Sequence, residues 1–593
     1  MYISLINKHI DLFIIIYILN FNNKQYGVNL TMKKILIVGG VAGGASAAAR
    51  LRRLNEEDKI IMFEKGPHVS FSNCSLPYYI GGLVPNEETL LLMSPEKFLK
   101  QFNIDARVNS EVVAIDRDKK EITVISEGKE YKESYDKLIL SMGAKPIVPP
   151  IKGIEKVNIF TVRNVVDIGK IHNFLNGKNN AKVTVIGGGF IGIEMAENLK
   201  KAGYNVTIVE ALPQIMKPFD YDMVQILHKE LIDNGVDLIV NDKVDSFDNN
   251  TVILGSGKKI EADAVILAIG VIPETDIAVK SGIELGKTKA IKVDANYLTN
   301  DKDIYAIGDA IEVYGALFND YFKLALAGPA QKQARAVADH INGRTVDNRG
   351  FIGSSVIKVF DYNGASTGLS EGFIKAMNLN IDYDTVEIVP FDGVSIMPSS
   401  QLLHFKLIYE IPTGKVLGAQ AIGKGNVDKR IDVIATVIKF GGTIDDLKDL
   451  ELCYAPLFGT AKDVVNFAGY VASNLRNGDF KQVHYSQVRE LVENGAYFVD
   501  VRMPEDFAVA HLENAINIPL TVLRKRYNEI PKDKPVYITC KTGLTSYTAC
   551  KILQNIGFKN VINVSGGFIG LSQYEYYNDK ITGRKPILTG YFK

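Results

Sequence analysis

A strand, a glycine-rich turn and a helix are encoded by Ile35-Leu36-Ile37-Val38-Gly39-Gly40-Val41-Ala42-Gly43-Gly44 and the Ala-rich residues that follow through Arg53. Glycines between a strand and a helix let the backbone turn tightly and approach a pyrophosphate at the helix N-terminus. The next apolar run, Ile60 to Phe63, is followed by Glu64, whose carboxylate can accept a hydrogen bond from a ribose hydroxyl.

The same pattern returns in Val183-Thr184-Val185-Ile186-Gly187-Gly188-Gly189-Phe190-Ile191-Gly192. A helix through Lys201 and a strand that ends in Glu210 follow it. One glycine-rich turn is weak support for a nucleotide site, because such turns also occur without a ligand. Two turns in the same order, each with an acid after the next strand, predict two dinucleotide sites. Their candidate residues are Gly39, Gly43, Gly44 and Glu64, and Gly187, Gly189, Gly192 and Glu210.

Two further apolar strands, within 138–146 and 265–273, end in glycine- and proline-containing turns and predict crossings between two nested domains. A third strand ends at Asp309, which is either a helix N-cap or a ligand residue. Short β-branched runs alternate with helical stretches along the chain. This alternation is typical of α/β domains with parallel sheets.

The composition argues against several classes of partner and site. The chain has 593 residues, enough for several domains, and a formal net charge of zero. Because there is no charge excess, we expect no nucleic-acid partner and no membrane surface. The four cysteines form no CxxC pair, so we expect no disulfide framework, no metal site and a reducing, cytoplasmic location.

The first 31 residues contain an apolar run, Leu12 to Leu19, that is too short to span a bilayer. We expect Met32 to be the true start and residues 1–31 to be a non-native or disordered leader. A signal or anchor segment remains the alternative.

Two isolated cysteines indicate sulfur chemistry. Cys74 lies in Ser70-Phe71-Ser72-Asn73-Cys74-Ser75-Leu76-Pro77-Tyr78-Tyr79-Ile80-Gly81-Gly82, soon after the first glycine turn. Cys540 follows the strand 536–539 and opens a loop at a helix start, where backbone N–H groups can converge on an anionic persulfide. The alternative for Cys540 is a buried apolar residue, and this is the favoured interpretation of Cys550.

From Met32 to about Tyr470 these motifs resemble the flavin-dependent pyridine nucleotide–disulfide oxidoreductases, and the Cys74 segment resembles their single-cysteine branch, which reduces coenzyme A disulfide, persulfides or polysulfides. The resemblance implies FAD at the first loop and NADH at the second. An acid at Glu210 would repel a 2′-phosphate, although NADPH stays possible. The resemblance also implies a homodimer, and it adds Lys65, Gly143, Asp309 and Gly270 to the cofactor-binding residues.

The same resemblance assigns substrate residues. Tyr454 would reach from the partner subunit toward the catalytic Cys74, although an interface packing residue is the alternative. Members of the family carry a second tyrosine where this chain has Val394 to Ser399, so coenzyme A disulfide itself is a less certain substrate. The residues expected to contact coenzyme A are Arg50, Arg53, Ser70, Asn73 and Lys462, with solvated charges as the alternative for the basic ones.

From about His484 the chain resembles a single rhodanese domain, with Cys540 as its sulfur carrier. Thr545 stands where arginine is common, which makes thiosulfate a less favourable donor. We therefore expect two nested Rossmann-like domains, FAD-binding (32–145 and 266–345) and NAD(P)H-binding (146–265). An α+β dimerisation domain (346–472) and an α/β rhodanese domain (480–580) follow.

The expected function is NAD(P)H-driven reduction, through Cys74, of a small thiol disulfide or persulfide, coupled to sulfur transfer by Cys540. We expect Cys74 to react as a thiolate stabilised by the flavin environment and by local N–H donors, with Ser70 and Asn73 nearby. One alternative is an NADH oxidase or peroxidase that cycles through a Cys74 sulfenic acid, but relatives of that type carry a histidine where this chain has Ala42. The other is a redox-sensing flavoprotein without turnover.

Overall fold

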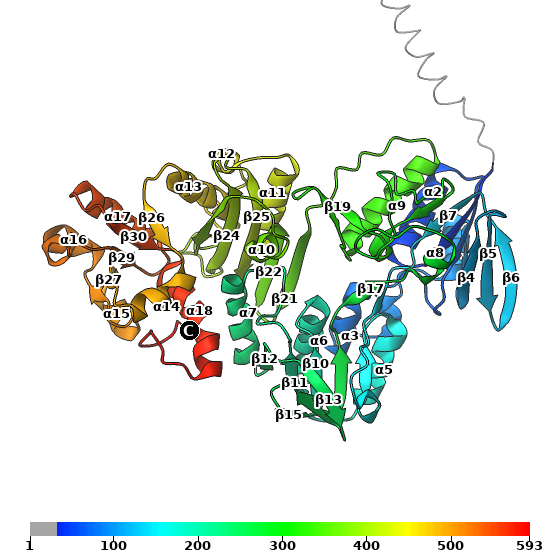
Figure 1. The fold of residues 1–593 in the computed structure, drawn as a ribbon, viewed down its shortest axis with the longest axis horizontal. Coiled ribbons are helices and arrows are strands. Elements are labelled where there is room, and N and C mark those ends of the chain that lie inside the picture. Colours follow the sequence, from blue (N-terminus) through cyan, green and yellow to red (C-terminus); the bar gives the residue numbers. More distant parts are fainter. Residues whose placement is uncertain (1–31, 593) are drawn as a thin grey trace, which may run out of the picture.

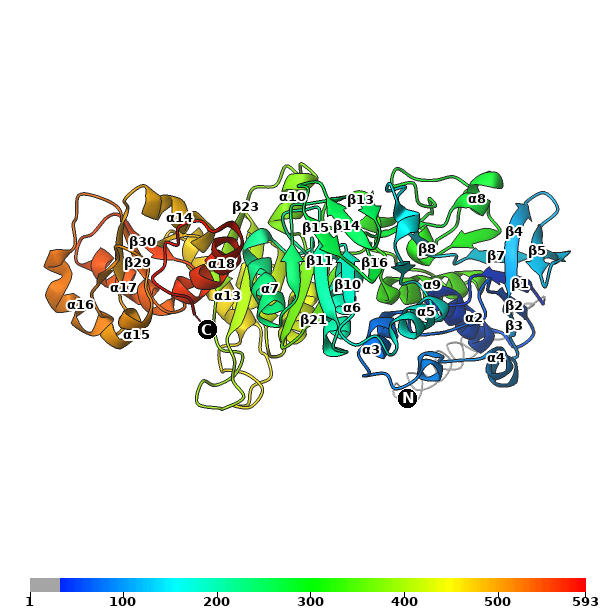
Figure 2. The same ribbon diagram turned by 90° about the horizontal axis from the view of Figure 1, so that it is seen from below.

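The computed structural model describes residues 32–592, so the expected leader lies outside the described residues. The N-terminal unit, blue in Figure 1, and the C-terminal unit, orange and red, lie at opposite ends of the molecule, and Figure 2 shows the same order along its length. Within 32–592, no helix has the length and apolarity needed to cross a bilayer. The predicted α/β fold class is confirmed by three five-stranded parallel sheets and one five-stranded antiparallel sheet within the described residues.

The first unit is built on a parallel sheet with strand β1 at its centre. The sheet order is β18 (Ile304–Ala306), β7 (Lys137–Leu140), β1 (Lys34–Val38), β2 (Lys59–Phe63) and β3 (Asp105–Arg107). Helix α2 (Ala42–Leu54) packs against α9 (Ala327–Ile341). Residues 35–37 are completely buried, because helices cover a parallel sheet and its strands need apolar side chains on both faces.

The second unit repeats this plan with β10 at the centre. Its order is β12 (Asp237–Ile239), β11 (Asn205–Val209), β10 (Lys182–Ile186), β16 (Ala264–Leu267) and β9 (Ile159–Thr161). Helix α6 (Phe190–Lys201) comes directly after β10 in the chain. Strands β8 (Ala144–Pro146) and β17 (Val271–Pro273) pair antiparallel. The two predicted crossings therefore lie side by side.

The third unit carries an antiparallel sheet, and the fourth carries a parallel one. The third sheet runs β21 (Ser354–Val359), β22 (Tyr362–Gly368), β25 (Val416–Gly423), β24 (Leu403–Glu410) and β23 (Tyr383–Ile388), with helices α10 (Glu371–Ala376), α11 (Val427–Lys439) and α13 (Val464–Arg476). The fourth runs β26 (Lys481–Val483), β30 (Val561–Val564), β29 (Val536–Thr539), β27 (Tyr497–Asp500) and β28 (Ile516–Asn517), with α17 (Leu544–Asn555) and α18 (Gly567–Thr582).

The Cys74 segment leaves the first unit and packs on the second. Cys74 lies in a 3-10 turn, Asn73–Ser75, that leads into α3 (Leu76–Ile80), and α3 packs against α6. Leu76 and Ile80 belong to the apolar core of the second unit. This apolar contact places the cysteine where the two dinucleotide units meet.

Candidate active sites

The two glycine turns hold their acids in the same way. A carboxylate oxygen of Glu64 accepts the N–H of Gly40 at 2.9 Å, and one of Glu210 accepts the N–H of Gly188 at 2.7 Å. The other oxygen of each acid accepts a second backbone N–H just after its own strand. Both carboxylates are thereby fixed at the mouth of a turn, with lone pairs left for ribose hydroxyls.

Both turns exclude side chains at their last glycine. A Cβ on Gly44 would overlap the carbonyl oxygen of Gly39, and one on Gly192 would overlap that of Gly187. Around Gly189, in contrast, no atom of the described chain lies within 4 Å of a built Cβ, so this face of the turn is open. The residues present therefore fit a dinucleotide pyrophosphate at each helix N-terminus.

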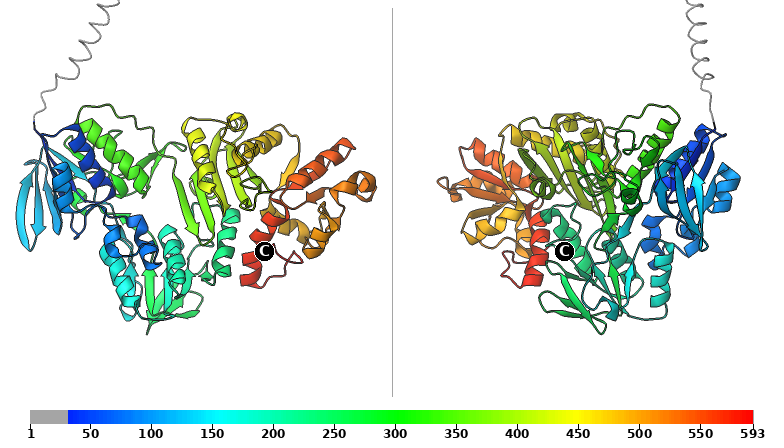
Figure 3. Two further views of the ribbon diagram at one scale, coloured as in Figure 1. Left: turned by 180° about the vertical axis from the view of Figure 1, so that it is seen from behind. Right: turned by 45° about the vertical axis from the view of Figure 1, so that its right-hand side comes forward.

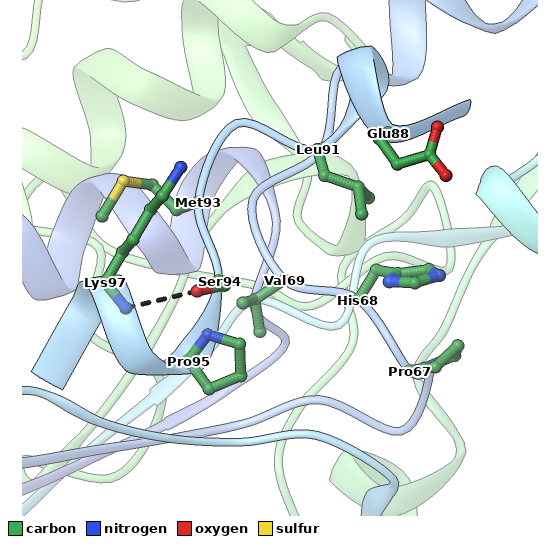
Figure 4. Close-up of a pocket in the computed structure, with 9 residues that line it drawn as sticks. All are labelled: Pro67, His68, Val69, Glu88, Leu91, Met93, Ser94, Pro95 and Lys97. Atoms are coloured by element: carbon green, nitrogen blue, oxygen red, sulfur yellow. Dashed lines mark hydrogen bonds between the residues drawn. The ribbon is translucent and has the colours of Figure 1, made fainter. Parts of the chain in front are cut away.

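Cys74 is exposed beside the first of these turns. The N–H of Ser70 donates to the carbonyl of Gly40 at 2.8 Å, which ties the cysteine segment to the glycine turn. A cavity of about 220 Å³ lies near this segment, and Figure 4 shows its lining of Pro67, His68, Val69, Glu88, Leu91, Met93, Ser94, Pro95 and Lys97.

The surroundings of Cys74 are acidic. Partial burial of the thiol, then the carboxylates of Glu194 and Asp309, raise the pKa of Cys74 above its ordinary value. The Asn73 amide donates to the carbonyl of Arg163 at 3.4 Å. The described side chains therefore do not stabilise the Cys74 thiolate, because carboxylates disfavour a second negative charge. Its stabilisation by the flavin environment and by N–H donors stays a prediction.

Two charged residues near Cys74 were not expected from the sequence. Glu194 lies on α6, and burial, followed by the charge of Glu197, raises its pKa to about 7. Arg163 precedes the second unit's first helix, and its guanidinium lies 3.8 Å from the Asp309 carboxylate. Neither belongs to a motif that the sequence displays, and only the packing of α3 on α6 brings Glu194 to the thiol.

The remaining cofactor candidates lie around the same junction. Asp309 is inside a short 3-10 turn, Gly308–Ala310, so its interpretation as a helix N-cap is wrong. Burial raises its pKa, and the Arg163 charge opposes that shift. Lys65 is exposed and pairs with Glu274 at 2.8 Å. Gly143 and Gly270 both have left-handed backbones, with φ of 75° and 112°.

The candidate substrate residues lie in three places: on the Cys74 segment, on α2 and on the third unit. Ser70 and Asn73 lie on the Cys74 segment, and Arg53 is exposed on α2. Arg50 instead pairs with Asp339 of α9 at 2.6 Å, so its charge is already compensated within the chain. Lys462 and Tyr454 lie on the third unit, where both are exposed.

Two loops of the third unit carry exposed apolar side chains, which we call the exposed apolar cluster. Ile396 on one loop is 80 % exposed, and Tyr454, Leu457 and Phe458 on the other are 52 %, 69 % and 64 % exposed. Arg430, almost completely buried, donates to the backbone carbonyl of Asp392 and to the Asp463 carboxylate, at 2.8 and 3.2 Å. It therefore ties the loop that contains Ile396 to the end of the loop that contains Tyr454.

Cys540 lies at the bottom of a loop between β29 and α17 and is 1 % exposed. Its Sγ accepts hydrogen bonds from the N–H of Gly543 at 3.2 Å and from the hydroxyl of Ser546 at 3.3 Å. These two contacts fix the sulfur at the start of α17. Cys550 on α17 is completely buried, as expected, and burial followed by the neighbouring Cys540 raises its pKa.

These features agree with matches to known families. The model of the pyridine nucleotide-disulphide oxidoreductases matches residues 33–334, and that of their dimerisation domain matches 354–463. The chain belongs to this family of oxidoreductases. A rhodanese-like domain matches 484–573.

Particular relatives are similar over most of the chain. The coenzyme A disulfide reductase of Staphylococcus aureus is 35 % identical over 444 residues, which cover 74 % of this chain and all of that protein. The crystal structure of reduced Bacillus anthracis CoADR-RHD is 46 % identical, with a TM-score of 0.89 over 92 % of this chain and 99 % of that one. A NAD-dependent persulfide reductase from A. fulgidus is 34 % identical, with a TM-score of 0.86 over 90 % and 99 %.

Proposed function

We propose that this chain is an FAD-dependent, NADH-driven reductase of coenzyme A disulfide or coenzyme A persulfide with a built-in sulfur-carrying domain. The position of Cys74 carries the proposal, because an exposed thiol at the junction of two dinucleotide units can exchange electrons with a flavin and sulfur with a substrate. Relatives named for coenzyme A disulfide and for persulfide reduction support the substrate class.

The cofactors would be held by groups already described. The first glycine turn with Glu64 and Asp309 would hold FAD, and the second with Glu210 would hold NADH, whose free 2′-hydroxyl suits a carboxylate. FAD, when bound, supplies two-electron transfer between a nicotinamide and sulfur. The chain's own part is to orient these groups and to keep Cys74 beside them.

Cys74 would form one intermediate with either substrate. Its thiolate attacks the coenzyme A sulfur and breaks the S–S bond, so that a persulfide releases hydrosulfide and a disulfide releases coenzyme A thiolate. The product in both cases is a mixed disulfide between Cys74 and coenzyme A. Two electrons from NADH then cleave that bond and return the thiolates of Cys74 and coenzyme A. Glu194, with its pKa of about 7, lies near Cys74 and could exchange a proton there.

Cys540 would supply the persulfide without net oxidation or reduction. Its thiolate takes the outer sulfur of a donor, the donor leaves with the electron pair of its S–S bond, and Cys540 becomes a persulfide. A coenzyme A thiolate then attacks the outer sulfur and frees Cys540. The absence of a phenol in 394–399 favours the persulfide over the plain disulfide.

We further infer a homodimer in which Tyr454 reaches the partner's substrate site. The exposed apolar side chains of Ile396, Tyr454, Leu457 and Phe458 support this inference, since several large apolar side chains exposed on one folded unit are typical of an interface.

A substrate panel under anaerobic conditions tests the proposal. Cys74→Ser should abolish NADH oxidation with coenzyme A disulfide, coenzyme A persulfide and inorganic polysulfide. Cys540→Ser should slow only the polysulfide reaction with catalytic coenzyme A, because preformed persulfide bypasses Cys540. Cys550→Ala is the matched control in the same domain. Equal loss on both sulfur substrates would refute the relay, and oxygen uptake with NADH alone at matching rates would favour an oxidase.

A further inference from the structure

A buried group of charges joins three of the four units. Lys406 on β24 is completely buried, and its ammonium lies 2.5 Å from Asp222, 2.6 Å from Glu371 and 3.3 Å from Asp220. A fourth carboxylate, that of Glu387 on β23, lies 3.9 Å away. Four carboxylates around one ammonium leave surplus negative charge, which must be hydrogen-bonded to be stable in the interior.

The C-terminal unit supplies the missing partners. The hydroxyl of Ser565 donates to one oxygen of Glu387 at 2.6 Å, and the imidazole of His484 lies 3.3 Å from the other. Glu387 and Ser565 are 5 % and 2 % exposed. A carboxylate of the third unit is therefore held by two side chains of the fourth, and a hydrogen bond to a buried charge is among the stronger ones.

Ser565 also borders the Cys540 loop. Gly566 and Gly567, which follow it, have φ of 64° and 59°, and a Cβ on Gly567 would lie 2.7 Å from the carbonyl oxygen of Cys540 and from the N–H nitrogen of Thr542. The next residue, Phe568, donates its N–H to the Cys540 carbonyl at 2.8 Å. A shift of Ser565 would therefore move the backbone that supports the sulfur.

The helix that begins at this turn is anchored elsewhere on the reductase. Helix α18 packs against α7 (Tyr221–Asp233) of the second unit, and Figures 1 and 3 show the red and green-blue helices side by side. The Tyr577 ring lies 4.6 Å from that of His228, and Tyr221 donates to Asn578 at 3.0 Å. The far end of α18 thus cannot adjust freely if its first turn is displaced.

We propose that Glu387, although it belongs to the reductase part, is a positioning residue for the Cys540 loop. Although burial disfavours its charge, His484 and then Lys406 keep the Glu387 carboxylate ionised. The carboxylate fixes Ser565, and Ser565 fixes the Gly566–Gly567 turn against the loop whose Gly543 N–H binds the Cys540 sulfur. The inference rests on the proposed sulfur-carrying role of Cys540. Sulfur transfer by Cys540 would then depend on a residue of the reductase part, whereas disulfide reduction by Cys74 would not depend on the Cys540 loop.

The test uses the full-length flavoprotein with inorganic polysulfide as donor, and mass spectrometry of the alkylated Cys540 peptide as readout. Glu387→Gln and Ser565→Ala should each slow Cys540 persulfide formation about tenfold, and the double variant should be no slower than either single one, because both break the same contact. NADH-dependent reduction of coenzyme A disulfide should stay within about twofold of the parent rate. Ser572→Ala, a buried serine of α18 that bonds the C-terminal segment instead, is the matched control.

The outcomes separate this inference from the proposed function. Parent-like persulfide formation in both single variants would overturn the inference and leave the function intact. No persulfide in the parent protein would overturn the function of Cys540 and the inference with it. Additive losses, or loss of disulfide reduction as well, would show a general effect on folding and would also overturn the positioning role.

Discussion

Phe568 donates its backbone N–H to the carbonyl oxygen of Cys540 across 2.8 Å, which links the first turn of α18 to the sulfur-carrying loop. The remainder of α18 packs on α7, and Tyr577 of α18 is part of the apolar core of the second unit. One helix therefore connects the Cys540 loop to the domain expected to bind NADH.

The approach of this helix to the loop requires glycine at position 567. Gly567→Ala would add a Cβ within 2.8 Å of three backbone atoms of the Cys540 loop at a φ of 59°, so we expect sulfur transfer to fall at least about tenfold while disulfide reduction persists. Gly583→Ala, at the other end of α18, has φ of 63° and no described atom within 4 Å. It shares the backbone strain but should leave sulfur transfer unchanged, and equal effects of both would argue against a steric cause.

The second glycine turn offers a similar pair. Gly192→Ala would push a Cβ into the Gly187 carbonyl, so we expect a lower melting temperature together with loss of NADH binding. Gly189→Ala meets no described atom within 4 Å and should melt like the parent protein while the KM for NADH rises, because only the pyrophosphate would approach that face. Thermal melting and steady-state kinetics separate the two, and an unchanged KM in Gly189→Ala would contradict a pyrophosphate at this turn.

Charge beside Cys74 should control its reactivity. Glu194→Gln removes one of the two carboxylates that raise the pKa of Cys74, so the pH profile of its alkylation by iodoacetamide should move to lower pH. A Cys453→Ser background removes the other exposed cysteine. The exposed, distant Glu284→Gln should leave the profile in place, and an equal shift in that control would contradict a local effect.

The contact between His484 and Glu387 predicts a pH-dependent stability. Although burial of the imidazole opposes its charge, the Glu387 carboxylate raises the pKa of His484 to about 8. Because the pKa is higher in the folded state, the charged His484 stabilises the folded protein fully below the ordinary value of about 6.5. This stabilisation is lost as the pH rises through 8. The difference between these two pKa values corresponds to about 2 kcal/mol in the free energy of unfolding. The melting temperature should therefore fall more between about pH 6 and pH 9 in the parent than in His484→Gln, and parallel curves would refute the contact.

The exposed apolar cluster predicts a dimer interface. Leu457→Glu places a charge at a position that is 69 % exposed in one subunit and would be covered in a dimer, so sedimentation should show dissociation and disulfide reduction should fall. Val509→Glu, at an 84 % exposed position of the C-terminal unit, is the control and should remain associated. A Leu457→Glu protein that keeps the parent's mass and activity would place the interface elsewhere.

The two glycine turns and the strand before Cys540 could be predicted from the sequence, because each depends on contacts between residues close along the chain. Glycine spacing after Val38 and Ile186 and the strand before Cys540 are local patterns of this kind. The third and fourth units were expected from the resemblance to known families. The acidic surroundings of Cys74 could not be predicted, since Glu194 reaches the thiol only through the packing of α3 on α6. The same holds for Arg50, whose charge Asp339 compensates from a distant helix.

By itself, therefore, the sequence determined that this protein has two glycine turns of the dinucleotide-binding pattern and two separate cysteines placed in loops. Only the tertiary structure decided which charges surround Cys74 and how Glu387 and Ser565 join the reductase to the Cys540 loop. The physical reason is distance along the chain. Backbone conformation is set by neighbouring residues, whereas electrostatic and hydrogen-bond partners such as these are chosen by the packing of elements hundreds of residues apart.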